Sequence, residues 1–159
     1  MLTAGLLALA MLGSRGDDQI AVRTVRSGDW TAKVRTDRFT GEIACTLRGP
    51  GMSFHRDTVV FEMGRHVDTS QAFFRLDGGA ARSVREPRLQ NETHGFFLDS
   101  DPVDNPSGGR VALPFSLVQS AKSVLVRANP RRAPRAFDVS GLPDALAAAK
   151  AAGCKEESF

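Results

Sequence analysis

The sequence is poor in the residues that most often build metal and catalytic sites. Its 159 residues include two cysteines and three histidines, and the histidines, His55, His66 and His94, are dispersed. A protein metal site needs several ligands held together, and neither residue type shows the spacing of a ligand motif. The sequence also has no Gly-x-Ser-x-Gly motif and no phosphate-binding glycine motif. We therefore predict no metal, no cofactor and no catalytic residue.

A small hydrolase that uses one of the three histidines is the alternative from another functional class. Ser53, His55 and Asp57 are two residues apart in turn, and in a strand they would share one face. A catalytic triad is assembled by the fold and not by sequence neighbours, so this spacing alone says little. A pocket that places a histidine beside a serine or a carboxylate would favour the hydrolase.

Charge of one sign is also scarce. The chain carries 21 Lys and Arg against 18 Asp and Glu, a formal net charge of +3, which is too small an excess to indicate a nucleic-acid-binding protein. The basic group Arg131, Arg132 and Arg135 lies in a proline-containing turn, and the planar donors of arginine suit phosphate or carboxylate. We name these three arginines as an anion-binding hypothesis, which requires other arginines to join them in one patch. Otherwise they form a solvated hairpin tip.

The most apolar run is short and lies at the N-terminus. Residues 1–12 fall below the roughly 20 residues that span a bilayer, but they match the hydrophobic region of a signal peptide. Ser14 and Gly16 offer small side chains for cleavage before Asp17. We predict a signal peptide over 1–16, one domain over 17–159 and no transmembrane segment in the mature chain. The protein would then be periplasmic or secreted, or cytoplasmic if the run is not a signal.

The two cysteines fit the same interpretation. Cys45 lies in an alternating run over 42–47 that points it toward a core, and Cys154 follows an alanine-rich helix. Because structural disulfides persist in oxidising compartments, we predict a Cys45–Cys154 disulfide in an exported protein. In a cytosolic protein the same residues would be two free thiols.

Short alternating runs separated by Gly, Pro, Asp and Asn predict a mainly β fold, an antiparallel β-sandwich-like single domain. Proline before the first turn predicts a short helix near 115–121, and a second helix is predicted near 141–152, capped by Ser140 and ended by Gly153. Trp30, Phe61 and Leu146 are assigned to the core. The predicted strands cover residues 20–25, 30–35, 42–47, 58–63, 73–76, 81–85, 95–98, 123–128 and 136–139.

Four segments carry a resemblance to a known family. They are Gly28-Asp29-Trp30-Thr31, Ile43-Ala44-Cys45, Leu113-Pro114-Phe115-Ser116-Leu117 and the closing run from Phe137 to Leu146. Over about residues 30–152 the chain resembles the invasion-associated locus B family of small secreted or envelope proteins. The resemblance implies a β-rich sandwich-like fold, export and no established catalytic residues. We therefore expect a non-enzymatic interaction or structural module of the cell envelope, whose partner is an envelope protein or an anionic envelope surface. A binder of anionic lipid or glycan is a separate alternative, which depends on the patch of Arg131, Arg132 and Arg135.

Overall fold

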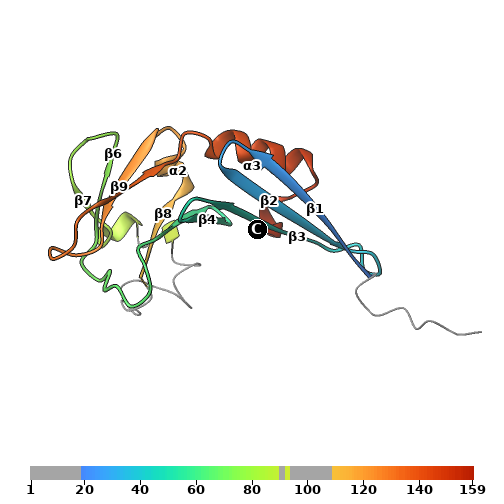
Figure 1. The fold of residues 1–159 in the computed structure, drawn as a ribbon, viewed down its shortest axis with the longest axis horizontal. Helices are drawn as coiled ribbons and strands as arrows, with labels where there is room; N and C mark the ends of the chain where they lie inside the picture. Colours follow the sequence, from blue (N-terminus) through green and yellow to red (C-terminus); the bar gives the residue numbers. More distant parts are fainter. Residues whose placement is uncertain (1–18, 90–91, 94–108) are drawn as a thin grey trace, which may run out of the picture.

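The computed structural model describes residues 19–89, 92–93 and 109–159, which form two antiparallel sheets and short helices (Figure 1). The first sheet has the strand order β1-β2-β3-β4-β5-β8 and the second has β10-β9-β6-β7. The first sheet comprises β1 (Ile20–Ser27), β2 (Trp30–Asp37), β3 (Ile43–Gly49), β4 (Met52–His55), β5 (Thr58–Glu62) and β8 (Arg110–Pro114). The second comprises β6 (Phe73–Leu76), β7 (Arg82–Ser83), β9 (Ser123–Arg127) and β10 (Arg135–Asp138). The predicted mainly β, sandwich-like fold is confirmed.

Alternation sets the two faces of the first sheet. Because side chains in a strand point to opposite faces in turn, Ala32 and Val34 of β2 share a face with Cys45 and Leu47 of β3, and all four are buried. The intervening residues of these strands face solvent. They include three basic side chains, Lys33, Arg35 and Arg48.

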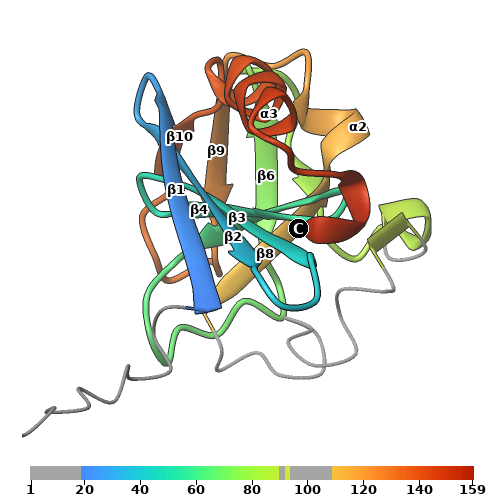
Figure 2. The ribbon, with the colours of Figure 1, turned by 90° about the vertical axis from the view of Figure 1, so that its right-hand side faces the viewer.

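The inner face of this sheet is covered in two halves. Helix α3 (Leu142–Ala151) packs over β1, β2 and β3, and the second sheet covers the remaining strands (Figures 1 and 2). The rings of Phe61 in β5 and Phe137 in β10 meet edge to face with centroids 5.0 Å apart, which joins the two sheets through the core. The predicted core residues Trp30, Phe61 and Leu146 are all buried.

The helices follow the prediction with one correction. Helix α2 (Phe115–Val118) is a single turn after Pro114, and α3 ends where Gly153 adopts a φ of 107°. The predicted Ser140 cap is wrong. The residue at the N-cap is Gly141, while the Ser140 hydroxyl donates to Asp138 Oδ1 at 2.7 Å and stabilises the preceding turn. A last short helix, η3 (Glu156–Ser158), leads to Phe159, whose buried ring packs on Phe54.

Strands β4 and β8 were not predicted from the sequence. Strand β4 has four residues between two tight turns, and β8 follows a stretch rich in turn residues, so neither shows a periodic signal of useful length. The predicted signal peptide over 1–16, the predicted strand over 95–98 and His94 lie outside the described residues. Across the described ranges, no helix has both the length and the apolar character to cross a membrane.

Candidate functional site

The predicted disulfide is present. Cys45 lies in β3, and Cys154 lies two residues before η3 begins. Their sulfur atoms are bonded at 2.06 Å, with Cα atoms 6.0 Å apart and a sequence separation of 109. The Cys154 amide donates to Ala149 O at 3.1 Å, which turns the chain back from α3 toward the sheet. Both cysteines are buried. The bond fixes the C-terminal helix to the inner face of the first sheet.

The structure separates Arg135 from the other two predicted anion-binding residues. Arg135 begins β10, where its guanidinium lies 5.0 Å from the centroid of the Phe137 ring. Its Nη1 donates to the carbonyl oxygen of Glu62 at 2.8 Å. Arg135 therefore lies against the first sheet, and its guanidinium already interacts with the Glu62 carbonyl group and the Phe137 ring.

Arg131 and Arg132 lie in the turn between β9 and β10, which projects from the end of the molecule opposite β1 (Figure 1). The Asn129 side chain shapes this turn, accepting from the Arg131 amide at 3.1 Å and donating to Asp68 O at 2.9 Å. Both arginine side chains are exposed. The turn therefore presents them outward from an ordered backbone.

A fourth arginine joins this turn from β9. Arg127 donates through Nη2 to Pro130 O at 2.5 Å and through Nε to Arg132 O at 3.3 Å. These acceptors are neutral carbonyl groups, so they orient the guanidinium without neutralising its charge. Arg127, rather than Arg135, is the residue that groups with Arg131 and Arg132.

The outer side of the second sheet adds apolar surface to this arginine group. Phe73 lies opposite Arg127 and Arg75 lies opposite Leu125 in the β6–β9 register, so the four side chains share one face. Phe73 is 42 % exposed although it is a large apolar residue. A hollow of about 420 Å³ opens here, and its lining also includes Ala81 and Pro134. We call the set Phe73, Arg75, Leu125, Arg127, Arg131 and Arg132 the arginine–phenylalanine face.

A second hollow, of about 280 Å³, contains His55 on the outer side of the first sheet. Burial lowers the pKa of His55, and the nearby positive charge of Arg56 lowers it further. Ser53 and Glu62 line the same hollow. His55 is opposite Thr58 in β5, and Glu62 lies four residues beyond Thr58, which places Glu62 about 13 Å along the strand from the His55 pair. Ser53, opposite Val60, lies between them. Glu62 is instead opposite Arg110 in β8.

The other candidates for catalysis, Asp57 and His66, do not line the hollow around His55. Asp57 lies in the turn after β4, where its backbone carbonyl accepts from the Phe115 amide at 2.7 Å. His66 is exposed in the loop between β5 and β6. The structure thus places His55 and Ser53 in one hollow without bringing His66 or Asp57 to it.

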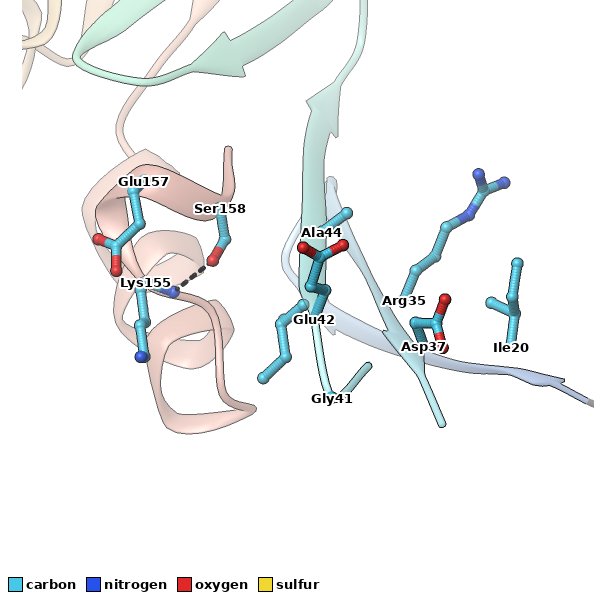
Figure 3. Close-up of a pocket in the computed structure, with 10 residues that line it drawn as sticks. Ile20, Arg35, Asp37, Gly41, Glu42, Ala44, Lys155, Glu157 and Ser158 are labelled. Carbon is cyan, nitrogen blue, oxygen red and sulfur yellow. Dashed lines mark hydrogen bonds between the residues drawn. The ribbon is translucent and has the colours of Figure 1, made fainter. Parts of the chain in front are cut away.

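A third hollow, of about 510 Å³, lies where the first half of β3 meets the C-terminal segment (Figure 3). Its charged side chains have both signs, and Arg35 and Lys155 lie on opposite sides of β3 in this view. The acidic members are Asp37, Glu42 and Glu157. Such a mixed lining offers no convergent group of one charge to an ionic ligand.

Side chains that bind metals do not cluster in the part of the chain that the structure describes. No three His, Cys, Asp or Glu side chains gather there in a way that could hold a metal ion. No family model, curated protein or solved structure matches the chain.

Proposed function

We propose that the protein is an exported, non-enzymatic module of the cell envelope that acts by binding, and that it is similar to the invasion-associated locus B family. The observation that carries the proposal is the Cys45–Cys154 disulfide. Reducing systems in the cytosol keep most thiols free, whereas structural disulfides persist in the periplasm and outside the cell. A structural disulfide that joins cysteines 109 residues apart therefore supports a location in an oxidising compartment.

The position of the resemblance segments supports a shared framework. Trp30, Cys45, Leu113, Phe137 and Leu142 are all buried. They come from both sheets and from α3, so they build the core that holds the sheets and the helix together. Resemblance at such positions supports a common architecture, and the binding surface must come from the exposed residues of this particular chain.

One experiment tests export and oxidation together. The tagged chain is expressed in a Gram-negative host, the periplasm is separated from the cytosol, and the intact mass is measured without reduction. We expect periplasmic protein that begins at Asp17 and lacks two hydrogen atoms relative to the reduced form. Cytosolic protein with Met1 and two alkylatable thiols would overturn the proposal.

The hollow around His55 gives hydrolysis as a second candidate function. Ser53 and His55 both line it, and a serine nucleophile next to a histidine base would react with an activated phosphonate. The test compares the wild type with Ser53→Ala and with His55→Ala, using a fluorophosphonate probe and mass spectrometry. Labelling at Ser53 that requires His55 would favour the hydrolase, and an unlabelled Ser53 would exclude a serine hydrolase at this hollow.

A further inference from the structure

We infer that the arginine–phenylalanine face docks on the surface of a lipid bilayer that contains anionic phospholipid. This inference rests on the proposed function, because it names the partner of an exported binding module. The face combines two features that such a surface recognises together: basic side chains for the phosphate groups and an exposed apolar side chain for the boundary of the hydrocarbon region.

The charge of this face is of one sign. Its basic members are Arg75, Arg127, Arg131 and Arg132. None of them is in an ion pair with a residue of the described ranges. Arg75 and Arg127 line the hollow, and Arg131 and Arg132 are exposed in the adjoining turn between β9 and β10. Together they make a positive surface that complements the negative leaflet of an anionic bilayer.

Two acidic residues border the strands and the turn that carry these arginines, and both accept local hydrogen bonds. The Asp77 carboxylate accepts hydrogen bonds from the Ser123 amide and hydroxyl and from the Lys122 amide. The Asp68 carboxylate accepts from the Ser70 amide at 2.8 Å. Both carboxylates are therefore held by local backbone turns, and neither forms an ion pair with an arginine of the face.

Apolar surface distinguishes a bilayer from a soluble polyanion. A polyanion needs only cations, whereas Phe73 and the half-buried Leu125 lie between the arginines and have apolar area to bury. Phe39 is 86 % exposed in the turn between β2 and β3, but this turn has one basic residue, Arg38, between the acidic Asp37 and Glu42, and an anionic surface repels the two carboxylates. Only around Phe73 do exposed aromatic and uniformly basic residues coincide within the described ranges.

The turn that carries two of the arginines is held in place before any ligand arrives. Asn129 fixes its backbone to Asp68, and Arg127 fixes the carbonyl groups of Pro130 and Arg132. A preformed turn loses less conformational entropy on binding than a mobile one. The turn therefore holds the backbone of Arg131 and Arg132 next to the Arg127 guanidinium.

The test measures cosedimentation of the purified full chain with vesicles of equimolar phosphatidylglycerol and phosphatidylcholine, and with vesicles of phosphatidylcholine alone. We expect binding to the first and little binding to the second, weakened by added salt. The double variant Arg75→Gln/Arg131→Gln should lose about 30-fold in affinity, since each basic residue near an anionic surface contributes a roughly fivefold factor. Phe73→Ser should lose about 3- to 10-fold.

Each variant has a matched control on a different surface. Lys33→Gln/Arg48→Gln removes the same charge from the solvent face of the first sheet, and Phe39→Ser removes the same ring from an exposed turn. Both controls should bind within about twofold of the wild type, because they lie outside the face. Circular dichroism checks that all variants are folded.

Three outcomes would overturn the inference. Absence of wild-type binding to the anionic vesicles would reject the bilayer as partner. Equal losses in the test and control variants would show attraction to net charge and no specific face. Unchanged binding by Phe73→Ser, with tight binding to soluble heparin, would indicate a soluble polyanion instead. None of these outcomes bears on export, which the fractionation experiment tests separately.

Discussion

Arg135 Nη1 donates a hydrogen bond to the carbonyl oxygen of Glu62 at 2.8 Å and so links the edge of the second sheet to the last residue of β5 in the first. Its guanidinium also lies over Phe137, whose ring packs on Phe61 in the core. One exposed arginine thus connects the sheets at the surface directly above their aromatic contact.

Replacing Arg135 should weaken the joint between the sheets. Arg135→Ala removes a charged hydrogen bond and a cation–π contact, and we expect the free energy of unfolding to fall by about 1–2 kcal/mol. Urea denaturation followed by Trp30 fluorescence measures the change. Arg132→Ala, which truncates an exposed side chain of the same type, should change stability by less than about 0.5 kcal/mol. Equal effects of the two substitutions would contradict the joint.

Removal of the disulfide should cost more than any surface substitution. The bond closes a loop with a sequence separation of 109, and in the chain-entropy model such a loop restricts the unfolded state by about 4–5 kcal/mol. Cys45→Ser/Cys154→Ser should therefore lower the free energy of unfolding by about 2–5 kcal/mol. Guanidinium denaturation of the variant, compared with the oxidised and the reduced wild type, provides the measurement. Reduced wild type and variant should agree, and a variant as stable as the oxidised protein would refute the stabilising role.

Gly109 should tolerate no side chain. Its φ is 63°, and a Cβ atom there would lie 1.7 Å from the carbonyl oxygen of Gly64, a backbone atom that cannot rotate away. We expect Gly109→Ala to prevent accumulation of folded protein or to lower its melting temperature sharply. Gly78→Ala is the matched control, because φ is 76° and the space around that Cβ is open. It should cost only about 1 kcal/mol, the usual penalty of a left-handed residue. A similar melting temperature for the two variants would contradict the close approach of the Gly64 and Gly109 backbones.

Asp77 should make stability depend on acid. The hydrogen bond from the Ser123 amide lowers the pKa of Asp77 below its ordinary value of 3.8, and bonds from the Lys122 amide and the Ser123 hydroxyl act in the same direction. A group whose pKa is lower in the folded state stabilises the fold above its unfolded pKa, and this contribution is lost as the pH falls through the folded pKa.

The variant Asp77→Asn tests this dependence. Asparagine tolerates the positive φ of 47° at this position, so the backbone conformation is kept while the charge is lost. We expect a lower melting temperature than that of the wild type at pH 7, and a difference that shrinks as the pH falls below 3.8. A difference of constant size across this pH range would assign the effect to turn geometry and not to the carboxylate charge.

Local alternation made the early strands and the disulfide predictable. The run from Ile43 to Leu47 has period-two apolar residues, which places Cys45 on the core face before its partner is known. The final helix was predictable because its glycine terminator precedes Cys154 directly. Strand β4 was not predictable, since four residues between two turns become a strand only by pairing with β3 and β5 on either side.

The arginine group shows where reasoning from sequence proximity fails. Arg131, Arg132 and Arg135 are neighbours in the chain, yet Arg135 lies in a strand and donates a hydrogen bond to the Glu62 carbonyl oxygen. Arg127 enters the turn instead, because its position at the end of β9 directs its side chain to the turn carbonyls. Sequence distance alone could not distinguish these two directions.

The sequence by itself determined which residues alternate, where turns interrupt them, where the last helix ends and that Cys45 faces inward, because these properties depend on side-chain chemistry over a few residues. Only the tertiary structure decided that Phe73 lies opposite Arg127 and Arg75 opposite Leu125. Strand register is set by pairing between segments far apart in the chain and by burial of the opposite face. The surface that we propose for binding exists only after those pairings have formed.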